Sequence, residues 1–338
     1  MTILSCALAL LSGVIGAGFA SGREIAFFFS SHGAYAAFAV LLSGAAMALL
    51  FVRLPAQLER TGTSSLMPLC RVRFGHRFGK LCAALFFLLF AVTGGAMLAA
   101  CAELAALLLP IRHAYGLGLV ISLLIAATLT RRGIHGLALP GAMLCILLPA
   151  LLCRLLLMPP GEAAFAPVGY ALHAAASGLC YGALNAAMVC GALPLLLPLT
   201  KRQRRWAAML FGALFTLLLT LAVCTLSRHR QAWRHQALPL VYLSRSLGKS
   251  GYIFCALTMY TAALSTLCAM LAGLAQMRSS KGVVLPATLC LCFAHLGFQG
   301  LVERAYPTLG WLCAALLMLL CLPLSDTNNS PDTEKADG

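Results

Sequence analysis

Charged residues are scarce in this chain, and acidic residues are the scarcest. Only 10% of the 338 residues are charged, and Asp and Glu together number 9. Soluble domains carry about 25% charged residues, so the composition excludes an ordinary water-soluble protein. Hydrophobic residues make up 61% of the chain, and the mean hydropathy is +0.93. The composition therefore predicts a polytopic membrane protein.

The sequence also lacks the short motifs of common hydrolytic and nucleotide-driven enzymes. It contains no H-E-x-x-H, no G-x-S-x-G and no G-x-x-x-x-G-K-[ST], so metal hydrolysis, α/β-hydrolase chemistry and ATP-driven pumping lack their usual residues. The 15 cysteines form no C-x-x-C pair and lie almost entirely in apolar runs. Packing is therefore favoured over disulfides or metal ligands. We expect no enzyme and no cofactor, apart from a possible Na⁺.

Positive charge is the one kind that is abundant, with a net charge of +15. In a soluble protein this excess would point to nucleic acid. Here the basic residues lie between apolar segments, so membrane topology and contact with anionic lipid explain them better. Most Lys and Arg fall on one side if both termini are cytoplasmic; the loop over residues 228–249 is the exception. We expect a multi-pass protein in contact with membrane lipids, with both termini in the cytoplasm and no nucleic-acid partner.

Ten apolar segments are near the length that crosses a bilayer. They cover residues 2–31, 34–52, 81–109, 115–130, 136–158, 168–199, 206–227, 250–277, 283–299 and 305–323.

The segments divide into two halves of five. An odd number of crossings in each half inverts the second half relative to the first. We expect one transmembrane domain over residues 1–325, built from repeats over about 1–160 and 165–325. A polar disordered tail is predicted to follow over residues 326–338.

The first segment is interrupted by glycines and then by an adjacent Arg and Glu. Residues 12–25 read Ser-Gly-Val-Ile-Gly-Ala-Gly-Phe-Ala-Ser-Gly-Arg-Glu-Ile. In lipid, an unwound stretch survives only where it lines a protein cavity or binds something. Charged residues there cost about 2.5–3.5 kcal/mol each on insertion scales. Many secondary transporters build a solute site in such a discontinuous helix, so the pattern favours a solute site over a merely kinked helix.

Backbone amides in this break are predicted to hold the anionic end of a solute. A helix that begins near Gly18 and Ser21 presents partial positive charge, and Gly16 lets a ligand approach the backbone. Arg23 and Glu24 are adjacent, so on a helix they point about 100° apart. We expect these two side chains to gate or couple transport, and a structural ion pair near the outer interface is the alternative.

The sixth segment, which opens the second half, contains a second weak point over residues 177–185, followed by Gly191 and Pro194. Interruptions at corresponding places in two halves are typical of transporter sites, but glycine pairs also mediate close helix packing. Tyr181 and Asn185 are four residues apart and share one helix face. Solute binding and interhelical hydrogen bonding both fit these two side chains.

The run from Gly16 to Ile25, with the aromatic residues after it and Gly33, resembles the signature of the YkvI-type bacterial membrane proteins. These are relatives of the amino acid–polyamine–organocation (APC) transporter superfamily. Tyr181 and Asn185 are similar to that family as well. The resemblance implies an all-α integral membrane protein with about ten transmembrane helices in a five-plus-five inverted repeat of the LeuT type, in which the first and sixth helices are discontinuous. It also implies a bacterial cytoplasmic (inner) membrane location.

The eighth segment carries two adjacent hydroxyls, Ser265 and Thr266, three and four residues after Ala262. This resembles the sodium site that many LeuT-type transporters build between their eighth and first helices, and the first helix would then add carbonyls near Ser12 and Ile15. Hard cations favour such oxygen ligands. Ser and Thr in membrane helices also commonly bond to their own backbone. Coupling to Na⁺ or to H⁺ therefore stays open.

Together these features predict a secondary active transporter of a small, amino-acid-like solute that works by alternating access. The alternative is a sensor or membrane-assembly protein that keeps a transporter-like fold without moving solute. A carrier would accumulate solute in liposomes under an ion gradient, whereas a sensor would bind solute without flux.

Overall fold

The described part of the chain is helical throughout and contains no β-strand. In the computed structural model it comprises residues 2–109, 111–132, 138–159, 170–230, 236–277 and 283–322. The polar tail predicted over 326–338 and the predicted boundary between the repeats lie outside these residues. Within them, seven helices are long and apolar enough to cross a membrane, and three shorter apolar helices accompany them. The predicted all-α, multi-pass membrane architecture is therefore confirmed.

Each of the ten apolar segments coincides with one or more helices. In chain order the elements are α1 (Ile3–Val14), α2 (Ala17–Ser21), α3 (Arg23–Phe28), the 3₁₀ helix η1 (Ser30–Tyr35), α4 (Ala36–Arg60), α5 (Leu66–Leu108), α6 (Ala114–Arg131), α7 (Ala138–Leu156), α8 (Ala171–Val189), the 3₁₀ helix η3 (Cys190–Leu196), α9 (Lys201–Arg228), α11 (Pro239–Ser244), the 3₁₀ helix η4 (Arg245–Leu247), α12 (Gly248–Met277), α13 (Val284–Ala294), α14 (Phe298–Gly300), the π-helical η5 (Leu301–Ala305) and α15 (Tyr306–Cys321).

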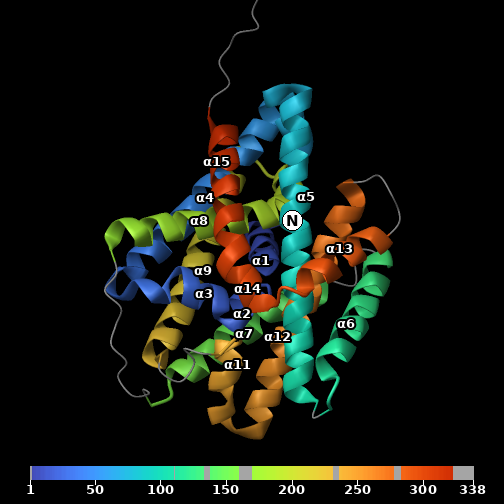
Figure 1. Ribbon diagram of the computed structural model, residues 1–338. Coiled ribbons are helices and arrows are strands. Elements are labelled where there is room, and N and C mark those ends of the chain that lie inside the picture. The colour runs from blue at the N-terminus through green and yellow to red at the C-terminus, as the bar shows by residue number, and fades with distance from the viewer. Residues whose placement is uncertain are drawn as a thin grey trace, which may run out of the picture.

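Two groups of helices surround the first segment. In Figure 1, α5 runs the height of the molecule, with α4, α8 and α9 on one side of it, α6 and α13 on the other, and α1 near the centre. Helix α4 packs against α8 and α9, while α5 packs against α6, α12 and α13. Buried residues of α1 recur at Cys6, Leu10 and Val14, a helical spacing that aligns them on one face. The first segment therefore lies in the core, between the two groups.

The interruption predicted for the sixth segment is wrong over residues 177–185, whereas its continuation at Gly191 and Pro194 coincides with the end of α8 and the start of η3. Helix α8 runs unbroken across residues 177–185, because its glycines serve close packing against α4. A Cβ on Gly182 would lie 3.0 Å from the carbonyl oxygen of Ser43, and a Cβ on Gly178 would overlap the carbonyl of Ala39. Small residues at this spacing let two membrane helices approach backbone to backbone. The α-helical geometry gives way only later, where η3 begins.

Replacing Gly178 by Ala should therefore destabilise the protein by about 1–3 kcal/mol, the usual cost of overpacking a well-packed interior. Gly116 is the matched control: it lies in α6, and no atom of the described residues occupies the space that its Cβ would fill. Gly116→Ala should be neutral or slightly stabilising, since Ala is the better helix former. Unfolding of the purified variants in mixed micelles checks both values. Equal effects of the two substitutions would contradict the packing role.

Candidate functional site

The first segment leaves the α-helical conformation twice. Helix α1 ends at Val14, and the backbone of Gly16 is extended, with φ −100° and ψ −176°, before α2 begins. At Gly22 the backbone enters the left-handed region, with φ 79°, and α3 then starts in a new direction. Glycine adopts that conformation at little steric cost. The predicted break in the first segment is therefore present, and it lies in the buried interior.

Three polar side chains are buried in this break. Ser21, Arg23 and Glu24 are 1%, 8% and 4% exposed. The Ser21 hydroxyl donates to the carbonyl of Gly18 (3.1 Å) and accepts from the backbone N–H of Arg23 (3.2 Å). Ser21 therefore satisfies backbone groups of the break itself, where the sequence had suggested contact with a solute.

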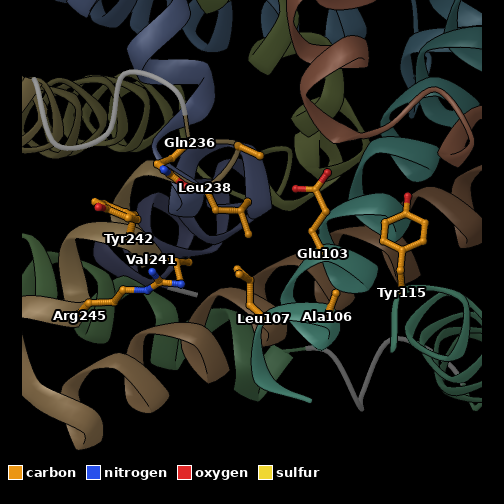
Figure 2. Close-up of a pocket in the computed structure, with 10 residues that line it drawn as sticks. Glu103, Ala106, Leu107, Tyr115, Gln236, Leu238, Val241, Tyr242 and Arg245 are labelled. Atoms are coloured by element: carbon orange, nitrogen blue, oxygen red, sulfur yellow. The ribbon is translucent and has the colours of Figure 1, made fainter. Parts of the chain in front are cut away.

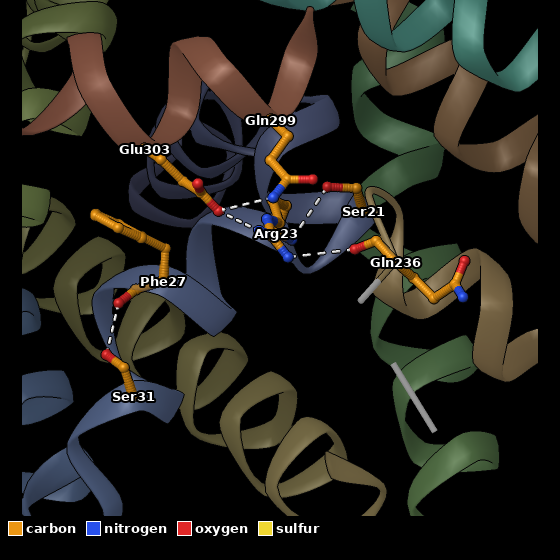
Figure 3. Close-up of polar contacts among 7 residues, drawn as sticks. All are labelled: Ser21, Arg23, Phe27, Ser31, Gln236, Gln299 and Glu303. Atoms are coloured by element: carbon orange, nitrogen blue, oxygen red, sulfur yellow. Dashed lines mark hydrogen bonds and ion pairs between the residues drawn. The ribbon is translucent and has the colours of Figure 1, made fainter. Parts of the chain in front are cut away.

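Arg23 reaches outward from the break to the C-terminal part of the chain. Its guanidinium forms an ion pair with the carboxylate of Glu303 in η5 and donates to the backbone carbonyl of Gln236 (3.3 Å). The side-chain amide of Gln299 donates to the same carboxylate (3.1 Å). Figure 3 shows the Arg23 side chain between the two segments that hold it. Arg23 thus joins the first segment to residues far along the chain.

Glu24 turns inward, away from the ion pair of Arg23. Its Oε2 accepts a hydrogen bond from the Tyr181 hydroxyl of α8 (3.1 Å). The Tyr181 ring is fully buried and lies 5.1 Å and 5.0 Å, between ring centroids, from Phe28 and Phe29. A Cβ on Gly18 would overlap the Glu24 side chain. Gly18 therefore makes room for a carboxylate that Tyr181 holds in place.

Tyr181→Phe should lower the free energy of unfolding by about 1.5–3 kcal/mol, because it removes a hydrogen bond to a charged group and leaves that buried group without its donor. Tyr115 offers a matched control, since it is half-buried and the one bond of its hydroxyl within the described residues is a long one, 3.5 Å, to the carbonyl of Ala294. Tyr115→Phe should change the free energy of unfolding by less than about 0.5 kcal/mol. Unfolding in mixed micelles measures both. A neutral Tyr181→Phe would show that this bond does not hold Glu24.

A small cavity lies beside the break. Its volume is about 10 Å³, room for about one water molecule. The walls come from five separate parts of the chain and include Gly16 and Glu24 of the first segment, Thr93 of α5, Asn185 of α8, Thr266 of α12 and Tyr306 of α15. Three residues predicted from separate segments, Gly16, Asn185 and Thr266, thus meet around one cavity with Glu24.

Two buried polar atoms in this wall have no hydrogen-bond partner among the described residues: Asn185 Oδ1 and the Tyr306 hydroxyl oxygen. The Asn185 amide nitrogen donates to the carbonyl of Tyr181 one turn earlier (2.9 Å), which fixes the amide orientation because a carbonyl only accepts. Most buried polar groups in proteins are satisfied. Orphaned atoms around a cavity therefore mark a place where a guest can supply the missing bonds.

Of the five residues in the predicted sodium site, Thr266 lines this cavity and the other four do not. Thr266 lies against Gly16, where a Cβ would come within 2.9 Å of its hydroxyl oxygen. That hydroxyl donates to the carbonyl of Ala262 (3.1 Å), and the Ser12 hydroxyl donates to Ala9 (2.8 Å), so both also bond within their own helices. No cluster of three or more His, Cys, Asp or Glu in the described parts of the chain could hold a metal ion. A sodium site of Ser12, Ile15, Ala262, Ser265 and Thr266 stays a prediction.

A second, larger cavity of about 300 Å³ lies next to the Arg23 contacts. Gln236, whose carbonyl binds Arg23, forms part of its wall. In Figure 2 the side chains of Glu103 and Arg245 lie on opposite sides of this cavity. Glu103 Oε2 is buried without a hydrogen-bond partner among the described residues.

Sequence reasoning missed Glu303 as the partner of Arg23. The available signal was scarcity, since a chain with only 9 acidic residues rarely places one between two apolar segments without a partner. Thr93 and Tyr306 carried no comparable signal, because single hydroxyls are common in membrane helices.

In comparisons with known proteins, no family model and no curated protein matches this chain. Its function has to be inferred from the chemistry of these sites.

Proposed function

We propose that this protein is a secondary active transporter that moves a small organic solute across the membrane by alternating access. One observation carries the proposal: a buried, doubly broken first segment holds two charged side chains that face opposite ways. Glu24 faces the small central cavity, and Arg23 faces the C-terminal part of the chain. Charges inside a membrane protein are costly and are usually functional. Broken helices with such groups are typical of transporter sites.

The small central cavity is the proposed solute site. Gly16, Asn185 and Thr266 line it together with Glu24, and Tyr181 positions the Glu24 carboxylate. Its volume of about 10 Å³ is too small for a whole organic solute, so the site would be closed in this conformation. Binding would need the surrounding helices to separate, and solute would then stabilise one arrangement over another.

The contact between Arg23 and Glu303 is the proposed gate. It ties α3 to η5, so it has to break if these two segments move apart. The π-helical geometry of η5 fits this role, because π-bulges within helices frequently occur at functional sites. Opening of this contact would connect the small cavity with the larger one that Gln236 lines.

The contacts between helices support the ten-helix inverted repeat that the sequence implied. In four of the five corresponding pairs the segments of the two halves pack against each other: α1 against α8, α4 against α9, α5 against α12, and α6 against α13. In the fifth pair, α7 and α15 make little or no contact in the described parts of the chain. A pseudo-two-fold axis between two inverted halves would produce this pairing. The relation to the YkvI-type proteins, the inner-membrane location, the orientation and the coupling to Na⁺ or H⁺ are parts of the same proposal.

Reconstitution into liposomes tests the proposal. The purified chain should accumulate one or more radiolabelled amino acids when a Na⁺ or H⁺ gradient is imposed, and accumulation should stop when the gradient is dissipated. Protein-free liposomes provide the control. Binding of an amino acid without accumulation under either gradient would favour the sensor alternative and overturn the transport proposal.

A further inference from the structure

We infer that the small central cavity recognises the positively charged end of its solute, through Glu24. This inference rests on the proposed function and specifies the chemistry of the group that enters the site. It reverses the polarity expected from the sequence, in which amides near Gly18 and Ser21 hold an anionic end. In the structure the space beside Gly18 is taken by the carboxylate of Glu24.

Charge is the first argument. Glu24 is the only charged side chain among the residues that line this cavity, and it is 4% exposed. Its hydrogen-bond partner is the Tyr181 hydroxyl, which carries no charge. The ion pairs found among the described residues are Arg23–Glu303 and Arg204–Glu59, so neither neutralises Glu24. A buried carboxylate without a counter-charge is unfavourable, and a cation entering the cavity would supply that charge.

Hydrogen bonding is the second argument, because Glu24, Asn185 and Thr266 present acceptors to the cavity, while the Tyr306 hydroxyl can donate or accept. The amide nitrogen of Asn185 donates to the backbone carbonyl of Tyr181, and Asn185 Oδ1 is left as an unpartnered acceptor among the described residues. The Thr266 hydroxyl donates within its own helix, so its oxygen lone pairs stay available to accept. The backbone N–H of Gly16 donates to a carbonyl of α1. A primary ammonium group offers three donors and no acceptor. It therefore complements the oxygens of Glu24, Asn185 and Thr266, whereas a carboxylate would be repelled by Glu24 and could be offered a hydrogen bond by the Tyr306 hydroxyl.

Size and the remaining wall are the third argument. A cavity of about 10 Å³ holds one water-sized group in this closed conformation, comparable to an ammonium head or a bare Na⁺ ion, and a carboxylate would require a wider separation of the helices. Phe19, Met97 and Met188 add apolar surface to the wall. Aromatic rings attract cations, and Met side chains adapt to irregular apolar groups. We assign the positive charge to the ammonium group of an organic solute, since this apolar surface suits the carbon atoms attached to it.

Ligands that carry only one end of an amino acid test this assignment. The purified full chain is heated in detergent with ethylammonium chloride, choline propionate, L-alanine or NaCl, with choline chloride as the ionic-strength control. A ligand of the folded state raises the apparent melting temperature by mass action. Ethylammonium and L-alanine should raise it in a concentration-dependent way, and propionate should not. A shift with propionate but not ethylammonium would overturn the inference. A shift with NaCl alone would overturn the assignment to an amine.

Two matched variants locate the effect at Glu24. Glu24→Gln should weaken the apparent affinity for ethylammonium by roughly 10- to 100-fold, as expected for the loss of a charge-assisted hydrogen bond. Glu59→Gln makes the same change in a carboxylate that is paired with Arg204 and does not line the small cavity, and it should leave the affinity within about twofold. If Glu24→Gln does not fold, Asn185→Ala, which removes the orphaned acceptor, should also weaken ethylammonium binding. Unchanged affinity in the folded variants would overturn the inference.

The binding assay tests the cation site and the uptake assay tests transport, so each proposal can be overturned without the other. Amine binding that depends on Glu24, without accumulation in liposomes, would overturn transport and leave the cation site standing. Accumulation of a solute that lacks any amine, and is unaffected by Glu24→Gln, would overturn the cation site and leave transport standing.

Discussion

Gly18→Ala should reduce solute uptake by at least roughly 10-fold, although it adds a single methyl group. The Cβ would overlap the Glu24 side chain, which Tyr181 and the surrounding rings hold from the other side. Overpacking of this kind costs about 1–3 kcal/mol, and 1.4 kcal/mol corresponds to a factor of 10 in affinity. In Gly18→Ala the overlap displaces the Glu24 carboxylate, which is the group proposed to bind the solute. Initial uptake rates in liposomes, at matched protein incorporation, provide the measurement.

A shorter acid provides the rescue for this variant. In the double variant Gly18→Ala/Glu24→Asp, the carboxylate is withdrawn by one methylene and the clash is relieved, so part of the uptake should return. Gly191→Ala is the neutral control, because nothing lies where its Cβ would be placed. Full activity of Gly18→Ala would show that the position of the Glu24 carboxylate is not critical. A double variant less active than Gly18→Ala alone would show that steric overlap is not the cause.

Replacing Arg23 by the uncharged Gln should lower both the stability of the protein and its uptake of solute. Breaking a fully buried ion pair by removing one partner costs about 3–5 kcal/mol. The Glu303 side chain is 33% exposed, so solvent screening reduces the expected loss for Arg23→Gln to about 1–3 kcal/mol. The gate would also lose its closed state, and uptake should fall by at least roughly 10-fold. Unfolding in mixed micelles and uptake in liposomes measure the two effects.

A double-mutant cycle separates the ion pair from other roles of Arg23. The variants are Arg23→Gln, Glu303→Gln and the combination, and the expected coupling energy is about 0.5–3 kcal/mol. Arg304→Gln is the control for a general loss of charge, because Arg304 neighbours Glu303 in sequence but is exposed, and it should leave uptake near the wild-type rate. Strictly additive effects of the two Gln substitutions would mean that the pair does not act as a unit.

The break in the first segment was predictable from its glycines. In the sixth segment, the helix is unbroken at Gly178 and Gly182 and changes only near Gly191 and Pro194. Gly16 and Gly22 change the direction of their own backbone, and that effect is local. Gly178 and Gly182 sit in regular helix and act through the backbone of α4. The same residue type thus serves unwinding in one segment and packing in the other. Only the neighbouring helix distinguishes the two uses.

The candidate site was predictable as a set of segments but not as a set of contacts. The sequence placed Arg23 and Glu24 in a functional break and associated Asn185 and Thr266 with it. It did not give Arg23 its partner Glu303, which lies 280 residues away along the chain. It also favoured an anionic group at the break, whereas we propose a cationic one, because the acceptors around Glu24 come from helices whose rotation no local pattern specifies.

The sequence alone determined that this protein is a membrane-embedded helical bundle with an interrupted first segment. Long apolar runs and helix-breaking glycines act within a few residues, so no knowledge of neighbours is needed to interpret them. The tertiary structure alone decided where the two charges of the break point, which glycines pack rather than unwind, and which polar atoms surround the small cavity. Those outcomes depend on how helices far apart in sequence face one another, and helix packing fixes that orientation only when the whole chain has folded.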